Sequence, residues 1–356
     1  MKLLPLVPKS PNSAIKYSEE EALWAAAVER DELALEYFGQ KRGVLDSLGY
    51  CILEGFCSDK GIPDRLQVPY CDPDGDVIAE LADYFVGKFP GEEALRSERN
   101  RTLWSPIVNT RDTDEADRSR GKGRFITTME GICAHLEQEP DLSWVVEKRA
   151  MLDARLGQIL AAMRLGGEDM ALPAVDTLKT PRSGGRFLLT GEGCPRQALH
   201  TDFQVEEGSR LSELPGYFLI CTTGEATPLW VVDHSHFFLR RPPQALHVLS
   251  RGVVARKVII PPYSVLIGRG DLQHAGAGHE DNPNPSVRGS IRYHIYFVPH
   301  SQKLMDGVHY PTDLNPDFEE DESEQSEGAG GDDGDKSGSS VESEEEDRAE
   351  SGDEEV

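Results

Sequence analysis

The chain has 356 residues, with 37 Lys/Arg and 63 Asp/Glu, which gives a formal net charge of −26 at pH 7. This acidic composition argues against non-specific binding to a nucleic-acid backbone, which requires clustered cations. No stretch approaches the roughly 20 apolar residues of a membrane helix, and the six cysteines form no C-x-x-C pair, so we expect an intracellular protein, cytoplasmic or nuclear, with reduced thiols.

The N-terminal part has mainly helical patterns. Residues 18–40 predict an amphipathic helix, with Ser18 as its cap and three glutamates at its positive end. A short helical piece then ends at Gly49, and the β-rich run "YCILEGF" follows. The segment "WVVEKRAMLDARLGQILAAMRLG" predicts a long helix that two glycines stop. We expect residues 1–170 to be largely helical support for what comes after.

From Arg186 onward the chain consists of short β-rich runs separated by turn residues. The runs are "RFLLT", "GYFLICTT", "PLWVVD", "GVVARKVII", "YSVLIGRG" and "GSIRYHIYFVP". Their spacing indicates an antiparallel sandwich or barrel rather than alternating strands and helices. The predicted fold class is α+β with a mainly β core over 171–315, in one domain of 1–315.

Residues 316–356 have a different composition. From Asp317 onward the chain carries 19 Asp/Glu against two basic residues, with Gly/Ser spacers and almost no apolar side chains. Such a segment cannot bury enough surface to offset its conformational entropy, so we expect a disordered acidic tail. The tail is a candidate for binding basic proteins.

Three side chains have the types and spacing of a metal site. His200 and Asp202 stand on alternate residues in "PRQALHTDFQV", and His274 follows much further along the chain, at the end of a predicted strand. Two histidines and one carboxylate form the facial triad of non-haem iron(II) oxygenases, which leaves three iron positions open. The alternative is that these polar residues are unconnected.

The strand after His274 supplies candidate ligands for a carboxylate. Arg288, Ser290, Arg292, His294 and Tyr296 alternate along "VRGSIRYHIY" and therefore share one face. A 2-oxo acid bound to the metal has a second carboxylate, and the fork-shaped guanidinium of arginine suits it. We place Arg288 first as the anchor and Arg292 as its rival.

With these residues the chain resembles the iron(II)- and 2-oxoglutarate-dependent dioxygenases, in particular the phytanoyl-CoA dioxygenase-like branch. The matching motifs are "HTD", "GDLQHAG" and "RGS", with softer likeness in "VVDHSH" and "LDSLGYCILEGF". The likeness covers 186–299 well and 40–57 loosely. The stretch from His274 to Arg288 is longer than is usual in the family, because "AGAGHEDNPNPS" makes a generous loop.

The resemblance implies a double-stranded β-helix, a jelly-roll like that of the cupins, with helices packed outside. Iron(II) would bind His200, Asp202 and His274, and Arg288 would bind the 2-oxoglutarate carboxylate. The substrate would be hydroxylated, or demethylated through an unstable hydroxyl, as 2-oxoglutarate becomes succinate and CO2. Ser290, Arg292 and Tyr217 are further candidates for the cosubstrate pocket.

Two other functions stay open at this point. The chain could be a cupin-like binding or scaffold protein without turnover, or a cupin metalloenzyme that does not use a 2-oxo acid. The triad together with an arginine anchor favours the oxygenase. The substrate is not predicted, because small molecules and macromolecules are both accepted by this fold through loop variation.

Overall fold

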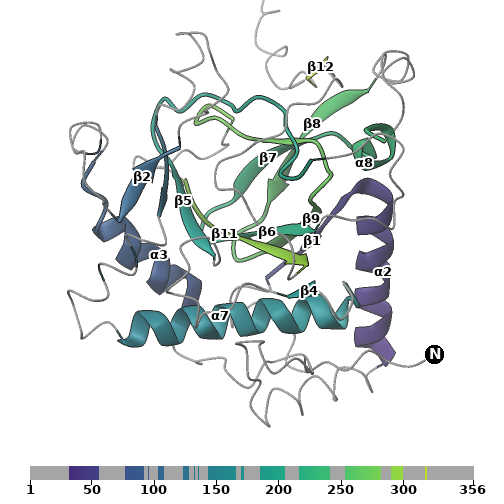
Figure 1. Cartoon of the computed structure of the whole chain (residues 1–356), viewed down its shortest axis with the longest axis horizontal. Helices are drawn as coiled ribbons and strands as arrows, with labels where there is room; N and C mark the ends of the chain where they lie inside the picture. The colour runs from purple at the N-terminus through teal and green to yellow at the C-terminus, as the bar shows by residue number, and fades with distance from the viewer. Residues whose placement is uncertain are drawn as a thin grey trace, which may run out of the picture. The chain divides into compact units, whose positions relative to one another are not determined.

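A computed structural model of the chain describes residues 32–55, 77–91, 95, 103–107, 123–127, 132, 135, 143–165, 170–171, 185–204, 216–240, 253–281, 290–299 and 317–318. Its helices are α2 (Glu32–Leu48), α3 (Val77–Gly87), α7 (Ser143–Ala162) and α8 (Ser235–Phe238). The fold is mixed α+β and mainly β (Figure 1).

The strands follow in chain order. They are β1 (Tyr50–Leu53), β2 (Trp104–Pro106), β3 (Arg124–Thr127), β4 (Met170–Ala171), β5 (Arg186–Thr190), β6 (Tyr217–Thr222), β7 (Thr227–Val231), β8 (Val254–Ile260), β9 (Val265–Arg269), β10 (His274–Gly276), β11 (Ser290–Pro299) and β12 (Asp317–Phe318). The six β-rich runs predicted from the sequence are therefore confirmed as β5, β6, β7, β8, β9 and β11.

The strands form two sheets. The larger has the order β1-β9-β6-β11-β5-β3-β2, with β4 paired to β11, and the smaller has the order β10-β7-β8-β12. All pairs are antiparallel except β8 with β12. An isolated bridge joins His200 to His274 of β10, which adds the segment around His200 beside the smaller sheet. Two antiparallel sheets in this order match a double-stranded β-helix.

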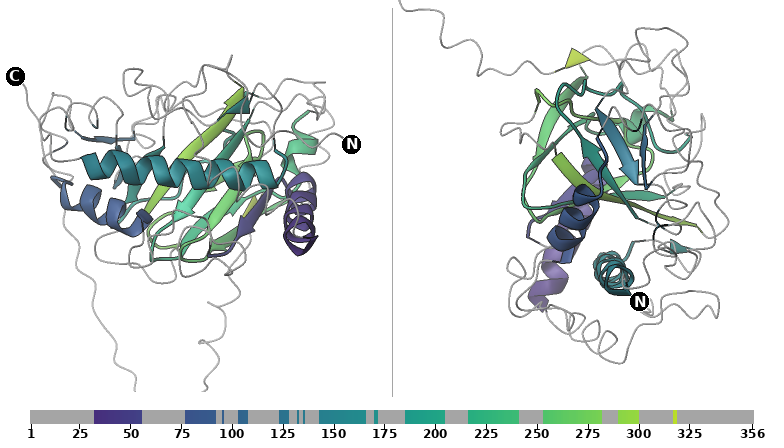
Figure 2. Two further views of the ribbon diagram at one scale, coloured as in Figure 1. Left: turned by 90° about the horizontal axis from the view of Figure 1, so that it is seen from below. Right: turned by 90° about the vertical axis from the view of Figure 1, so that its left-hand side faces the viewer.

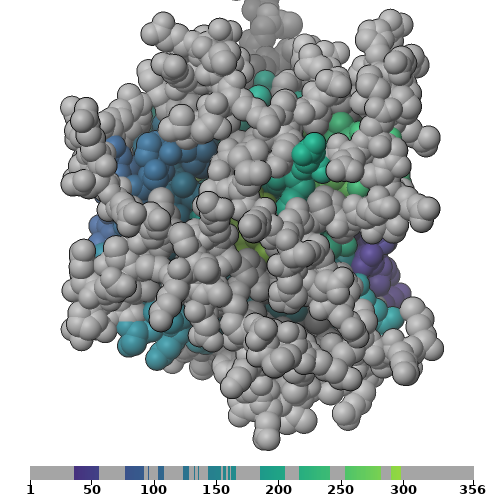
Figure 3. All heavy atoms as spheres, viewed as in Figure 1, coloured from purple at the N-terminus to yellow at the C-terminus, as the bar shows by residue number. Residues whose placement is uncertain are grey.

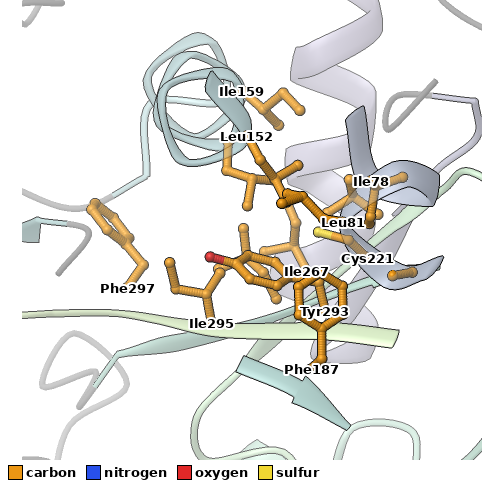
Figure 4. Close-up of a cluster of buried hydrophobic side chains, with 14 of the residues drawn as sticks. Ile78, Leu81, Leu152, Ile159, Phe187, Cys221, Ile267, Tyr293, Ile295 and Phe297 are labelled. Atoms are coloured by element: carbon orange, nitrogen blue, oxygen red, sulfur yellow. The ribbon is translucent and has the colours of Figure 1, made fainter. Parts of the chain in front are cut away.

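Two apolar layers cover the two faces of the larger sheet. On one face, residues of α3 and α7 pack against Phe187, Ile267, Tyr293 and Ile295, as Figure 4 shows. In Figure 2, α7 lies lengthwise in front of the strands in the left-hand view and is seen nearly end-on, to one side of them, in the right-hand view. On the other face, side chains of β6 and β9 pack against β7 and β8 of the smaller sheet.

The strand alternation of β11 separates these two environments. Tyr293, Ile295 and Phe297 belong to the helix-facing core. The intervening side chains, Arg292 and His294 among them, therefore point to the interior between the sheets. This alternation puts a polar row inside the barrel, where the candidate site lies.

The N-terminal part agrees in outline with the sequence and differs in detail. The predicted helix of 18–40 and the short piece before Gly49 are one helix, α2, within the described residues. It lies at the surface in Figure 3, where its purple side chains are visible and Val44 is 42% exposed. Residues 1–170 contribute α2, α3 and α7, and also β1, β2 and β3 of the larger sheet.

The remaining expectations are met to different extents. No helix in the described ranges is long and apolar enough to cross a membrane. The cysteines that the structure describes, Cys51, Cys194 and Cys221, are buried and form no disulfide. The acidic tail of 316–356 lies outside the described residues apart from β12, which pairs with Val254 and Ala255 of β8.

A buried carboxyl group in the helix-facing core yields a pH prediction. Tyr293 donates its hydroxyl hydrogen bond to Asp153 Oδ1 at 2.7 Å, and Asp153 is 1% exposed. Burial raises the pKa of Asp153 from its ordinary 3.8 to about 6. The folded state therefore binds this proton more tightly than the unfolded chain does, and the carboxyl destabilises the fold as pH rises from 3.8 to about 6.

The Asp153→Asn variant should lack this dependence, because an amide keeps the oxygen that accepts from Tyr293 but does not ionise. We expect its free energy of unfolding to gain on that of the wild type as pH rises from 3.8 to about 6, by up to about 3 kcal/mol at roughly 1.4 kcal/mol per pKa unit. Urea titrations of both proteins across this range measure the difference, and a flat difference curve would contradict the prediction.

Candidate metal centre

A backbone pairing brings the two histidines together. His200 N–H donates to His274 O and His274 N–H donates to His200 O, both at 2.9 Å. On its other side His274 pairs with Val231 of β7. The smaller sheet therefore fixes His274, and the mutual pair fixes His200 directly opposite it, although the two are far apart along the chain.

The side chains of His200, Asp202 and His274 converge. Their ligand atoms all lie within 4.8 Å of one another. Asp202 Oδ1 is 3.9 Å from His200 Nε2, and Asp202 Oδ2 is 3.7 Å from His274 Nε2. The three side chains are 3–7% exposed. Among the described residues, no other group of three or more His, Cys, Asp or Glu meets this metal-site geometry.

Both imidazoles are oriented through their Nδ1 atoms. His200 Nδ1 lies 2.8 Å from Ala198 O, and His274 Nδ1 lies 3.0 Å from Leu272 O. A carbonyl oxygen only accepts, so Nδ1 carries a proton in each ring, and in the neutral ring the lone pair is on Nε2. Both Nε2 atoms are the nitrogens that lie nearest Asp202, which is the arrangement that a metal ion requires.

Asp202 gives the test of whether these residues fit a metal. Its Oδ2 is buried and has no hydrogen-bond partner among the described residues. An unpaired buried carboxylate oxygen is costly, and metal coordination is one of the few ways in which proteins compensate it. Two neutral imidazoles and one carboxylate are the donor set of a non-haem iron(II) site, so the residues present fit that ion.

The residues that precede His274 are also held in place by hydrogen bonds and ion pairs. Gln273 N–H donates to Ser235 Oγ at 2.8 Å, and Ser235 belongs to the "VVDHSH" motif. Asp271 is fully buried and forms two ion pairs, from its Oδ1 to Arg269 Nε at 2.9 Å and from its Oδ2 to Arg240 Nη2 at 2.5 Å. This paired carboxylate and the serine together fix the turn that leads into β10.

Two arginines lie in the barrel interior. Arg292 of β11 is 5% exposed, and its Nε has no hydrogen-bond partner among the described residues. Burial, and then the positive charge of Arg124, lower the pKa of Arg292 to about 9, so that it is still a cation at neutral pH. Cys194 acts in the opposite direction, and no carboxylate is among the charges that act on Arg292. Arg292 is therefore a buried cation without a carboxylate partner among these interactions.

Arg124 of β3 differs in its two terminal nitrogens, which donate hydrogen bonds, although its Nε, like that of Arg292, has no hydrogen-bond partner among the described residues. It is 1% exposed and donates to Gln197 Oε1 at 3.2 Å and to the carbonyl of Ala277 at 2.9 Å. Burial lowers its pKa, as it does that of Arg292. Arg124 therefore contacts the two segments that carry His200 and His274.

His294 lies on the same strand face as Arg292. Burial lowers the pKa of His294 to about 4, because the nearby negative charge of Asp202 does not offset the lost hydration. Its Nε2 is buried without a hydrogen-bond partner among the described residues. A neutral imidazole thus stands near the triad without being part of it.

The other residues predicted from the sequence lie in different places. Arg288 is outside the described residues. Ser290 is buried, with its Oγ 3.4 Å from Thr227 Oγ1. Tyr217 packs in the helix-facing core and stacks on Phe297, so the structure does not bring it to the triad.

Sequence reasoning did not identify Arg124 or Thr227. Nothing in the sequence around Arg124 signals that it is buried. His294 was placed from the sequence on one strand face with Ser290 and Arg292, but its position near the triad was not predicted.

No protein-family model and no curated protein sequence matches the chain. Among solved structures, AviO1 from Streptomyces viridochromogenes is 17% identical, with 74% of this chain and 95% of that one covered and a TM-score of 0.43. EctD from S. alaskensis with 2-oxoglutarate and 5-hydroxyectoine is 15% identical over 89% and 93%, with a TM-score of 0.39. The non-heme alpha ketoglutarate dependent epimerase SnoN from nogalamycin biosynthesis is 12% identical over 76% and 84%, with a TM-score of 0.38.

At these levels of similarity the chain's own strand order and ligand distances carry the assignment. The two antiparallel sheets match a double-stranded β-helix, and the site has the His-x-Asp…His ligand set of a non-haem iron(II) facial triad. The motifs around His200 and His274 on which the resemblance to the iron(II)- and 2-oxoglutarate-dependent dioxygenases rests are thus brought together in space.

Replacing Asp202 with Ala should abolish tight metal binding and leave the fold intact. The change removes a ligand and also an unpaired buried oxygen, so we expect the melting temperature of the metal-free variant to equal or exceed that of the wild type. Titration with Co(II), a spectroscopic substitute for Fe(II), measures the affinity, and calorimetry measures the melting temperature. Retained affinity, or global unfolding of the variant, would contradict the assignment.

Proposed function

We propose that the protein is an oxygenase dependent on iron(II) and 2-oxoglutarate, which hydroxylates or oxidatively demethylates its substrate. The observation that carries the proposal is the buried triad, with two imidazole Nε2 lone pairs facing a carboxylate that has an unpaired oxygen. The net reaction would convert substrate, 2-oxoglutarate and O2 into hydroxylated substrate, succinate and CO2.

The triad and its neighbours would have separate roles. His200, Asp202 and His274 would hold iron(II) on one face, and the ion would supply the chemistry that joins O2 to the 2-oxo acid. The carbonyls of Ala198 and Leu272 keep both imidazoles in the metal-binding tautomer. The burial of the triad limits access of water to it.

Arg292 is the residue that best fits the far carboxylate of 2-oxoglutarate. It is a buried cation on the interior face of β11, and its Nε has no hydrogen-bond partner among the described residues. It stands two residues from His294, whose pKa is affected by the charges of Asp202 and His274. The hydroxyls of Ser290 and Thr227 lie together on the same interior side. A carboxylate there would compensate the burial of the guanidinium and accept a forked pair of hydrogen bonds.

This reverses the order of preference that the sequence suggested. Arg288 matches the "RGS" motif of the resemblance, but Arg292 is supported by its burial on the interior face of β11 and by the lack of a carboxylate among the charges that act on it. Arg288 stays a candidate from the sequence, to be compared directly with Arg292 by titration.

The burial of Arg292 also bears on the two alternatives. A scaffold protein without turnover has no reason to bury in one barrel a cation and a carboxylate that each have an atom without a hydrogen-bond partner among the described residues, since each costs stability. A metalloenzyme that does not use a 2-oxo acid needs the triad but not Arg292. The pair of features thus favours an oxygenase with an anionic cosubstrate.

The class of substrate is left open in this proposal, since loops outside the barrel set it. Binding of basic proteins by the acidic segment from Asp317 onward likewise stays a prediction from composition.

Anaerobic titration with Fe(II) and then 2-oxoglutarate tests the proposal. We expect a weak visible charge-transfer band on addition of 2-oxoglutarate to the wild type. Arg292→Met should bind Fe(II) normally but require at least about tenfold more 2-oxoglutarate, the order of loss for a charged hydrogen bond of about 1.5–3 kcal/mol.

Arg288→Met is the matched comparison. If it raises the 2-oxoglutarate requirement and Arg292→Met does not, Arg288 is the anchor and the assignment of Arg292 is wrong. If Fe(II) binds to the wild type but no band follows, the protein is a metalloprotein of another kind. If Fe(II) does not bind, the scaffold alternative replaces the oxygenase.

A further inference from the structure

The pairing of the two ligand segments is interrupted immediately beside the histidines. In a regular antiparallel ladder, the mutual pair of His200 and His274 would be followed by a second mutual pair, of Ala198 with Gly276. Instead Gln197 N–H donates to Gly276 O at 3.0 Å, one residue out of register. One segment thus has an extra residue opposite the other, which is the geometry of a β-bulge.

The bulge releases the carbonyl of Ala198. In the regular ladder this oxygen would accept from Gly276 N–H; here it accepts from His200 Nδ1 at 2.8 Å. The bulge therefore makes the hydrogen bond that sets the tautomer of His200. Without it, Ala198 O would have a backbone donor and His200 would lose its orienting partner.

The amide N–H of Gly276 would be left unpaired by this shift, but a side chain replaces the lost acceptor. Gly276 N–H donates to Gln197 Oε1 at 3.0 Å. The same Oε1 accepts from Arg124 Nη1 at 3.2 Å. Gln197 thus uses its backbone N–H and its side-chain oxygen to bind both sides of one glycine.

Arg124 closes the arrangement from the larger sheet. Its Nη2 lies 3.3 Å from Pro195 O, 3.4 Å from Gly276 O and 2.9 Å from Ala277 O, so that one guanidinium contacts both ligand segments. A Cβ at Gly276 would overlap Arg124 Nη1 and Gln197 Oε1, which leaves room for glycine alone. The side chains of Arg124 and Gln197 and the backbone of Gly276 therefore pack as one unit.

We propose that Arg124 and Gln197 are positioning residues, which stabilise the bulge before His200 and so hold its imidazole in the metal-binding tautomer and orientation. We call this pair the brace. Neither residue touches the metal position; both act through Gly276 and Ala198. The proposal rests on the proposed function in that the triad is taken to hold a metal ion.

Two substitutions at Gln197 separate the hydrogen bond from side-chain bulk. Gln197→Met keeps the length but has no acceptor, so Gly276 N–H and Arg124 Nη1 both lose their partner. Gln197→Glu keeps an acceptor oxygen and adds a charge opposite to that of Arg124. Arg149→Met is the control for general loss of stability, because Arg149 is a buried arginine that donates to Gly185 O on the helix-facing side.

Metal affinity is the first measurement, by titration of each metal-free protein with Co(II). We expect Gln197→Met to bind Co(II) about 10–100-fold more weakly, as is typical when a group behind a metal ligand is removed. Gln197→Glu should retain the wild-type affinity. Arg149→Met should melt at a lower temperature and bind Co(II) normally.

The tautomer is the second measurement, and it requires no metal. In isotope-labelled histidine NMR of the metal-free protein, the Nδ1–H proton of His200 should be visible in the wild type and in Gln197→Glu, and lost in Gln197→Met. Should Gln197→Met fail to fold, Gly276→Ala gives the same test by displacing both partners.

The outcomes distinguish the brace from the metal site. If Gln197→Met keeps both the Nδ1–H signal and the wild-type Co(II) affinity, the brace has no positioning role. If Gln197→Glu is as impaired as Gln197→Met, an acceptor oxygen at this position does not preserve the site and the proposal is overturned. If the wild type shows the Nδ1–H signal but binds no metal, the proposed function fails while the bulge stands.

Discussion

The mutual backbone hydrogen bonds between His200 and His274 are the constraint on which the site depends. They join segments that are distant along the chain, and closing so long a loop costs conformational entropy that this pair alone cannot offset. The two sheets and their apolar layers provide the compensation. The ligand distances at Asp202 follow, because that side chain projects from the turn two residues beyond the pair.

The interruption of this pairing is as important as the pairing itself. Both His200 and His274 hydrogen bond to the carbonyl two residues before them, Ala198 and Leu272. In a regular ladder these carbonyls would face backbone donors of the opposite segment. Regular backbone pairing is thus replaced by hydrogen bonds that orient the two imidazoles. Burying the charges of Asp202 and Arg292 also costs stability, and a bound metal ion and a bound anion would offset that cost.

Much of this could be read from the sequence, for identifiable reasons. Alternation and turn residues predict most of the strands from β5 to β11 because these strands have buried faces, and "HTD" with "GDLQHAG" predicts the triad. The sequence favours Arg288 over Arg292 as the carboxylate anchor, and the proposal of Arg292 instead depends on its burial, which the sequence does not show. Arg124 was missed because its role follows from the pairing of β3 with β5, which are far apart along the chain.

X-ray absorption spectroscopy of the Fe(II)-loaded protein under anaerobic conditions would test the central claim most directly. The account predicts scattering from two imidazole rings, with oxygen donors completing the shell and no sulfur. His294, with its unpaired Nε2 near the triad, is not expected to coordinate. A third imidazole, a single imidazole, or a sulfur donor such as Cys194 would contradict the triad of His200, Asp202 and His274 as the iron site.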